Sequence, residues 1–77
     1  METITIKDDF IKLGQAMKLA GLVEEGCDAK FEIQEGNVLV NGEVENRRGK
    51  KLTDGDVISF HGRTVKVKAA SAGKMQE

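Results

Sequence analysis

The residues best suited to chemistry in this sequence are the cationic side chains that follow Asn46. Four of the five residues from 47 to 51 are basic, namely Arg47, Arg48, Lys50 and Lys51. Arginine guanidinium groups donate paired hydrogen bonds to phosphate oxygens, and lysines add point charges. Gly49 lets the backbone between them approach a ligand closely. The pattern predicts a phosphate-binding loop in a chain whose formal net charge is only −1.

Other kinds of reactive site have little support in this sequence. The chain has one cysteine, Cys27, and one histidine, His61, so it forms no internal disulfide and offers no paired thiolates to zinc. Neither residue has the context of a nucleophilic pair, and no Gly-rich phosphate loop or metal-ligand spacing occurs. We therefore expect no catalytic residues, no metal and no cofactor, with Cys27 near a helix start and His61 in a turn.

Length and composition indicate one small globular domain. The chain has 77 residues, of which 39% are hydrophobic and 32% charged, a balance typical of folded proteins with a small core. No apolar run is long enough to cross a bilayer, and the polar start METITIKDD lacks the apolar region of a signal peptide. We expect a cytoplasmic domain over residues 1–70 and a flexible tail over 71–77.

A first helix is predicted after Asp8 and Asp9, whose carboxylates suit a helix N-terminus. Gly21 is placed to end it. Apolar residues recur at three- and four-residue spacing on one face, namely Phe10, Leu13, Met17 and Ala20. The polar residues Lys12, Gln15 and Lys18 fall on another side of this helix.

A second, shorter helix is predicted from about Cys27 to Glu35. Ala29 and Ile33 lie one turn apart with Phe31 beside them, and Gly36 is positioned at the C-terminal end. Only a short connection separates this helix from the first, so the two should lie next to each other.

The remaining segments predict strands joined by tight turns. Residues 3–6 alternate as TITI, residues 38–40 form the apolar run VLV before Asn41-Gly42, and residues 57–60 and 63–68 flank His61-Gly62. A two-residue turn at His61-Gly62 places Phe60 opposite Arg63 and puts Ile58, Val65 and Val67 on the inward face. The predicted fold class is α+β, with two N-terminal helices packed on one side of a small, mainly antiparallel sheet.

These elements carry a resemblance to a known family. The residues concerned are Lys12-Leu13, Ala20-Gly21, Ala29, Gly36, Val38-x-Val40-Asn41-Gly42, Leu52 and Gly55-Asp56-x-Ile58. In this order they resemble the S-four domain, an RNA-binding module named after a small-subunit ribosomal protein, and its small stand-alone bacterial branch. Two positions depart from the family pattern. The chain has Lys12-Leu13-Gly14 in place of Arg-Leu-Asp, and Gly26 and Cys27 near the place of a Ser-Arg pair.

The resemblance implies a positively charged surface, formed by the paired helices and the following loop, that docks onto folded RNA. The candidate RNA-binding residues are Lys12, Gln15, Lys18, Lys30, Arg47, Arg48, Lys50 and Lys51. The implied partner is a structured ribosomal or transfer RNA, with the ribosomal particle as a further candidate, and we expect a monomer.

The few aromatic residues bear on the kind of RNA. Phe10, Phe31 and Phe60 are the only aromatic residues, and we expect all three in the core, which leaves none to stack on bases. Recognition of structured RNA by shape follows from this expectation. RNA binding by the basic loop also requires that most glutamates lie away from that loop. The alternative function is a protein-interaction module, associated with the ribosome, whose basic loop holds an acidic protein partner.

Overall fold

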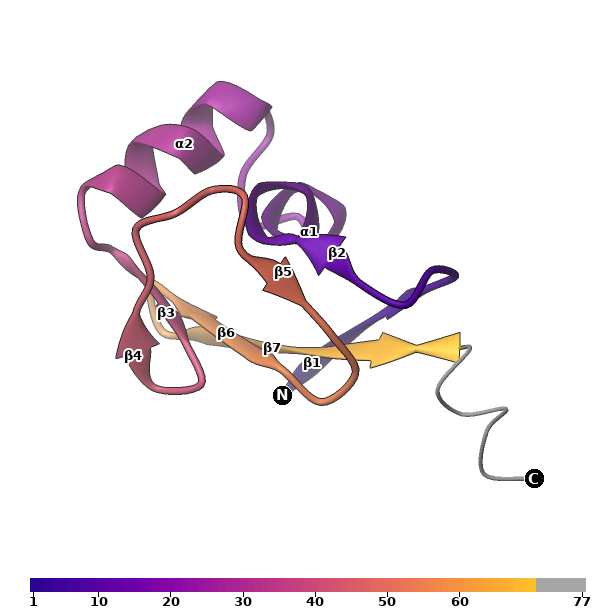
Figure 1. Cartoon of the computed structure of the whole chain (residues 1–77). Coiled ribbons are helices and arrows are strands. Elements are labelled where there is room, and N and C mark those ends of the chain that lie inside the picture. The colour runs from indigo at the N-terminus through magenta and orange to yellow at the C-terminus, as the bar shows by residue number, and fades with distance from the viewer. Residues whose placement is uncertain (71–77) are drawn as a thin grey trace.

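A computed structural model describes residues 1–70 of the chain, and the predicted flexible tail, 71–77, lies outside the described residues. The two helices cover one side of the main sheet, while a second, smaller sheet lies beside α1 (Figure 1). The elements are β1 (Glu2–Ile6), β2 (Ile11–Lys12), α1 (Leu13–Leu19), α2 (Gly26–Gln34), β3 (Val38–Val40), β4 (Glu43–Val44), β5 (Lys51–Leu52), β6 (Val57–Phe60) and β7 (Arg63–Ala69).

The main sheet has five strands in the order β1-β7-β6-β3-β4. Strand β1 runs parallel to β7, and the other pairs are antiparallel. The short strands β2 and β5 form a separate antiparallel pair. The predicted α+β fold, with two helices on a mainly antiparallel sheet, is therefore confirmed.

The core is the apolar layer between the helices and the main sheet. Its largest fully buried side chains are Leu13, Met17, Ile33, Val38, Leu52, Ile58, Val65 and Val67. Residues four apart on a helix lie on one face, so Leu13 and Met17 point inward together, as do Ala29 and Ile33. This face of each helix is the one predicted from its apolar spacing.

Two tight turns set the register of the strands. His61 and Gly62 both have positive φ angles, 49° and 80°, which is the backbone of the two-residue turn that suits the twist of a hairpin. Phe60 consequently pairs with Arg63 and Ile58 with Val65, as predicted. Asn41-Gly42 makes the same kind of turn between β3 and β4, with φ angles of 53° and 85°.

The Asn41 turn is tied to the turn before β6. Asn41 Nδ2 donates to Asp56 Oδ1 at 3.0 Å, and Asn41 Oδ1 accepts from the Val57 amide at 3.0 Å. Asp56 Oδ2 also accepts from the Thr53 amide at 2.7 Å. The Val-Asn-Gly and Gly-Asp elements of the sequence therefore form one hydrogen-bonded unit, which fixes where the chain enters and leaves the loop between them.

The start of the first helix differs from the prediction. Residues 7–9 form a bend, Phe10 is 40% exposed, and the helix begins only at Leu13. Asp8 and Asp9 do not cap it, because residues 11 and 12 pair with β5 as strand β2 instead. This pairing joins segments some forty residues apart, which local spacing does not reveal.

Phe31 is a second correction. It was expected in the core but is 60% exposed. Ala29 and Ile33 face the core from the same helix, and a residue midway between them is turned by about 200° from each at 3.6 residues per turn. Phe31 therefore points away from the core, and of the three phenylalanines only Phe60 is buried.

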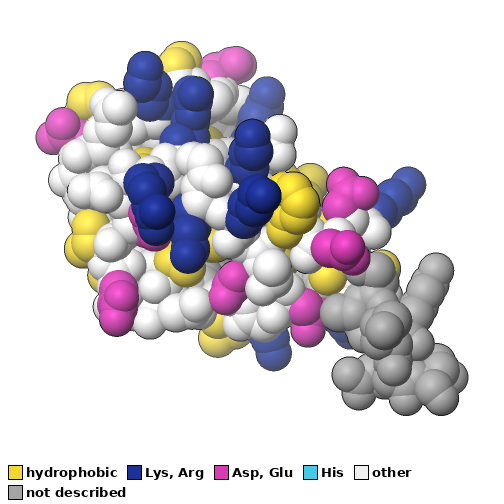
Figure 2. Space-filling view, viewed as in Figure 1, with side chains coloured by type: hydrophobic (Ala, Val, Ile, Leu, Met, Phe, Trp, Pro, Cys, Tyr) yellow, Lys and Arg dark blue, Asp and Glu magenta, His cyan; other side chains and the backbone are white. Residues whose placement is uncertain are grey.

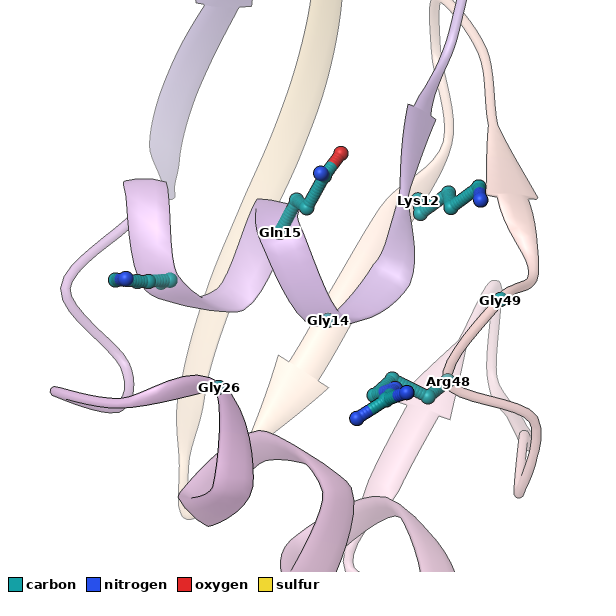
Figure 3. Close-up of a pocket in the computed structure, with 7 residues that line it drawn as sticks. Lys12, Gly14, Gln15, Gly26, Arg48 and Gly49 are labelled. Atoms are coloured by element: carbon teal, nitrogen blue, oxygen red, sulfur yellow. The ribbon is translucent and has the colours of Figure 1, made fainter.

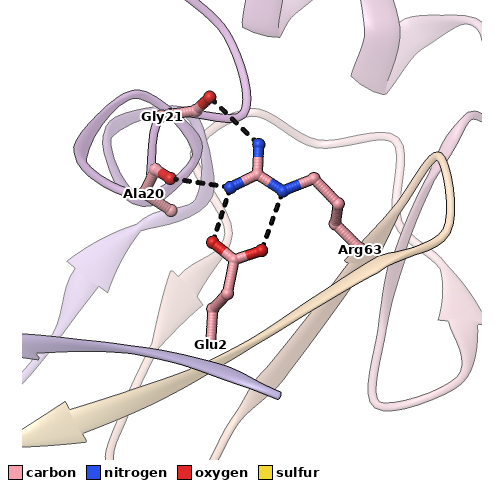
Figure 4. Close-up of polar contacts among 4 residues, drawn as sticks. All are labelled: Glu2, Ala20, Gly21 and Arg63. Atoms are coloured by element: carbon pink, nitrogen blue, oxygen red, sulfur yellow. Dashed lines mark hydrogen bonds and ion pairs between the residues drawn. The ribbon is translucent and has the colours of Figure 1, made fainter.

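An arginine joins β1 and β7, two neighbouring strands of the main sheet, to the end of the first helix. Arg63 Nε donates to Glu2 Oε2 at 2.8 Å, and its Nη atoms donate to the carbonyl oxygens of Ala20 and Gly21 at 3.4 and 3.3 Å (Figure 4). These carbonyls lie at the end of α1, where helices leave acceptors without partners. The Arg63 hydrogen bond lowers the pKa of Glu2 below its ordinary value of 4.5.

The lowered pKa of Glu2 predicts a dependence of stability on pH. A carboxyl group whose folded pKa is depressed stabilises the fold above its unfolded pKa, and this contribution is lost as pH falls through the folded pKa. We expect Glu2→Gln to lower the melting temperature at about pH 7 and to have little effect at about pH 3. Thermal unfolding followed by circular dichroism measures both, with Glu43→Gln on β4 as the control. An equal effect of Glu2→Gln at the two pH values would contradict this assignment.

Candidate functional site

An open depression of about 420 Å³ lies where α1, α2 and the loop of residues 45–50 meet. Its lining residues are Lys12, Gly14, Gln15, Lys18, Gly26, Arg48 and Gly49 (Figure 3). The polar side chains come from the end of β2, from α1 and from the loop, and glycines provide much of the remaining wall. The structure thus brings together Lys12, Gln15, Lys18 and Arg48, four of the residues named from the sequence.

The loop is held against the first helix by main-chain hydrogen bonds. Lys12, at the N-cap, makes no side-chain capping bond. Instead the Leu13 amide donates to the Lys50 carbonyl at 2.8 Å, and the Gly14 amide donates to the Arg48 carbonyl at 3.2 Å. Helix amides that lack internal partners need acceptors, and here the basic loop supplies them. The basic loop is therefore held next to Lys12 and Lys18.

Gly14 makes room for the Arg48 side chain. A β-carbon built on Gly14 would lie 2.7 Å from Cγ of Arg48 and 3.2 Å from its Cδ. Figure 3 shows the Arg48 side chain pointing from the loop towards the space between Gly14 and Gly26. The first of these contacts is closer than β-carbons come to other atoms, so any side chain at position 14 would require the Arg48 side chain to move. Glycine at this position, a departure from the family pattern, therefore leaves the space that the Arg48 side chain occupies.

Like charges lie opposite each other in the small sheet. Lys12 pairs with Lys51 across β2 and β5, and two cations facing each other destabilise a strand pair. Lys51 Nζ lies 4.8 Å from the centre of the Phe10 ring, a cation–π contact that offsets part of the repulsion. An anion bound between these lysines would offset more of it.

Arg47 differs from the other cations of the loop. Its Nε donates to Glu45 Oε2 at 2.9 Å, and Glu45 also accepts from the Arg47 amide at 3.1 Å. The hydrogen bond between the two side chains raises the pKa of Arg47 and lowers that of Glu45. Arg47 does not line the depression, and its charge is largely balanced by a neighbour in the loop.

The remaining candidates do not line this depression. Lys30 is exposed on α2, Lys50 is half-buried in the loop, and Lys51 is exposed on β5. Figure 2 shows that Lys and Arg side chains gather over the helices and the loop, while most Asp and Glu side chains on this face lie towards its edges. Apart from Glu45, which pairs with Arg47, the charges on this face are largely segregated.

Residues 1–70 offer no metal site and no membrane-spanning helix. Within this range no three His, Cys, Asp or Glu side chains lie close enough together to hold a metal ion. Cys27 is exposed on α2, and His61 is exposed in the β6–β7 turn. None of the helices in the described part of the chain has the length and apolar character needed to cross a bilayer.

Sequence reasoning missed the contributions of Phe10 and Gly14 to this surface. Phe10 has an apolar side chain at helical spacing from Leu13, which indicates a core residue until the pairing of β2 with β5 is known. Gly14 is unusual inside a helix, and that alone was a signal that another chain segment approaches it closely.

Comparison with known proteins identifies the family of this chain. Residues 4–68 match the S4 domain family, which is the RNA-binding module that the sequence resembles, and the chain belongs to this family. It is 48% identical over 59 residues to the "Probable ribosome maturation protein RlbA" of Bacillus subtilis, covering 77% of this chain and 83% of that protein.

A second relative has a known structure. The chain is 41% identical over 63 residues to YbcJ of Escherichia coli, covering 82% of this chain and 90% of YbcJ. The solution structure of YbcJ, described as revealing an αL motif involved in RNA binding, superposes with a TM-score of 0.70 over 90% of this chain and 89% of that one, at 40% identity. The fold and its αL arrangement are therefore shared with this relative.

The close approach of Gly14 and Arg48 predicts opposite effects of adding a methyl group at two glycines of the depression. Gly26→Ala meets open space and should leave the free energy of unfolding unchanged or raise it by up to about 1 kcal/mol. Gly14→Ala should destabilise the fold by about 1–3 kcal/mol, because Arg48 must move. Urea unfolding measures both.

A second measurement locates the change. In proton–nitrogen NMR spectra of Gly14→Ala, the amides of Arg48 and Gly49 should shift more than those at the far end of α1. Equal stability of the two variants, with shifts confined to α1, would show that Gly14 does not position the loop.

Proposed function

We propose that this chain is a non-catalytic RNA-binding protein that recognises structured RNA, ribosomal or transfer RNA, through the basic surface formed by α1, α2 and the loop of residues 45–50. The observation that supports this most is the convergence of Lys12, Lys18 and Arg48 on one glycine-lined depression. Membership of the S4 domain family and the printed descriptions of RlbA and YbcJ point in the same direction.

The chemistry of this surface suits a phosphate backbone. Arg48 offers a planar fork of donors to phosphate oxygens, while Lys12 and Lys18 supply mobile point charges. Glycines at positions 14, 26 and 49 leave backbone exposed in the depression, so a sugar–phosphate chain can approach closely. Contacts of this kind fix position on a folded RNA and carry little sequence information.

The other basic residues extend the surface beyond the depression. Lys30, Lys50 and Lys51 lie outside it on α2, the loop and β5, and Gln15 adds an amide that both donates and accepts hydrogen bonds. Arg47 contributes less to RNA binding than the others, because Glu45 already accepts its hydrogen bonds in the free protein. The proposed order of importance is therefore Arg48 and Lys12 first, and Arg47 last.

Of the two proposed RNAs, ribosomal RNA has the more direct support, and the proposed setting is the assembly of ribosomal particles in the cytoplasm. Support comes from the name of RlbA, which describes a ribosome maturation protein. A small domain that binds by shape and charge suits a role in holding an RNA fold. The protein would act as a monomer. An acidic protein partner on the same loop is the competing outcome, and structured RNA should displace such a partner if both use this surface.

The proposed site predicts a change in salt dependence. We expect the double variant Arg48→Ala, Lys50→Ala to bind captured cellular RNA more weakly, and each lost phosphate contact should reduce the slope of log affinity against log salt by about 0.7 to 0.9. The control removes two lysines from the opposite face of the sheet, Lys66→Ala and Lys68→Ala, for the same change in net charge. Filter binding at several salt concentrations measures both slopes.

Three results of this experiment are informative. Loss of slope in the loop variant alone supports the proposed surface, and the identity of the captured RNA names the process. Equal loss in both variants would mean that only overall charge matters. Failure of the wild-type protein to retain RNA at low salt, with retention of an acidic protein, would contradict RNA binding.

The pairing of Arg47 with Glu45 predicts a variant that binds more tightly. Glu45→Gln keeps a carbonyl oxygen for the Arg47 amide but removes the negative charge beside the loop. RNA affinity should rise by about two- to fivefold at low salt, and the gain should shrink as salt screens exposed charges. Glu43→Gln, on the neighbouring strand, is the control. An unchanged affinity in Glu45→Gln would show that Arg47 stays outside the RNA contact.

A further inference from the structure

A second open depression, of about 470 Å³, adjoins the first. It is lined by Lys7, Asp8, Asp9, Phe10, Lys12 and Gln15. Lys12 and Gln15 line both depressions, so the two form one continuous surface. Their chemistry differs, because the first is lined mainly by cations and glycines, whereas the second adds an aromatic ring and two carboxylates to Lys7 and the shared Lys12.

The Phe10 ring is partly exposed at the surface rather than packed in the core. Its side chain is 40% exposed and does not belong to the buried core cluster. Single exposed apolar residues are common and need no explanation. This ring, however, lies against the Lys51 ammonium group, whose nitrogen is 4.8 Å from its centre, and Lys51 pairs with Lys12 at the edge of the cationic depression. The ring is therefore embedded in the proposed RNA-binding surface.

The lining of this second depression suits a base better than a phosphate group. The Asp8 carboxylate offsets part of the attraction of Lys7 and Lys12 for a phosphate group, whereas a carboxylate accepts hydrogen bonds from the N–H and amino groups of bases. An aromatic ring offers a stacking surface to any base. The side chains of Lys12 and Gln15 stand between the place suited to a base and the place suited to a phosphate.

We propose that Phe10 is a stacking platform for an unpaired nucleobase of the RNA whose phosphates occupy the neighbouring depression. This inference rests on the proposed function and narrows its substrate class to folded RNA that presents an unpaired nucleotide beside a helix. A continuous duplex satisfies only the cationic depression, since its bases are stacked on one another. Phe10 thereby determines specificity, while Arg48, Lys12 and Lys18 provide affinity that is independent of base pairing.

The test compares two synthetic RNA hairpins. One carries a single bulged 2-aminopurine in its stem, and the other has the same stem fully paired. The wild-type protein should bind the bulged hairpin at least about fivefold more tightly, which is the lower end of the contribution of one stacked base. Binding should also quench the 2-aminopurine fluorescence, because stacking on an aromatic ring quenches it.

The variants separate stacking from general binding. Phe10→Leu keeps an apolar side chain but loses the ring, so it should abolish the preference and the quenching while binding the paired hairpin within about twofold of wild type and with the same salt slope. Phe10→Trp should restore both signals. Phe31→Leu, at an exposed phenylalanine on α2, should leave both unchanged. Because Phe10 lies outside the core, these proteins should fold, which circular dichroism checks.

The possible results distinguish this inference from the function on which it rests. One result would overturn the role of Phe10 and leave RNA binding standing. In it, Arg48→Ala, Lys50→Ala loses the salt-dependent binding, while Phe10→Leu keeps both that binding and the preference for the bulged hairpin. Equal weakening of both hairpins by Phe10→Leu also overturns that role, because the ring would then act only through Lys51. Absence of wild-type binding to either hairpin, together with no retention of cellular RNA, overturns both.

Discussion

The surface of this protein depends on two main-chain hydrogen bonds at the start of its first helix. The amides of Leu13 and Gly14 have no capping side chain, and the carbonyls of Lys50 and Arg48 accept from them. A helix end and a long loop thus satisfy each other's polar groups, since each would otherwise leave donors or acceptors without partners. The loop is as fixed as the helix it caps, although its own residues form no helix or long strand.

This arrangement explains how a chain with a net charge of −1 presents a cationic face. Charges that are distant in sequence are gathered by backbone contacts, and like charges are held opposite each other at Lys12 and Lys51. The fold accepts that repulsion because main-chain bonds and the buried Leu13 and Leu52 hold the segments together. Glu45 reduces the positive field most directly where it pairs with Arg47. Local geometry, rather than net charge, sets the electrostatic character of the face.

The elements that could be predicted from the sequence are those encoded by neighbouring residues. The register of the β6–β7 hairpin followed from His61-Gly62, and the inward face of the second helix from Ala29 and Ile33. The start of the first helix and the exposure of Phe10 could not be predicted, because both depend on the pairing of β2 with β5, which is distant in sequence. The exposure of Phe31 follows from helical geometry, because Phe31 lies midway between Ala29 and Ile33, which both face the core. The residue types of the candidate site could be identified from the sequence. The different environments of Arg47 and Arg48 could not, because they depend on the conformation of the loop.

The position of β1 has a consequence for how this fold is made. Strand β1 lies at the edge of the main sheet with β7 as its neighbour, and Arg63 bonds to Glu2 and to the end of α1. During synthesis the first strand emerges long before the last, and parallel pairing of such distant segments forms slowly. Strand β1 is therefore made before its partner strand is available. The main sheet can form completely only after β7 has been synthesised.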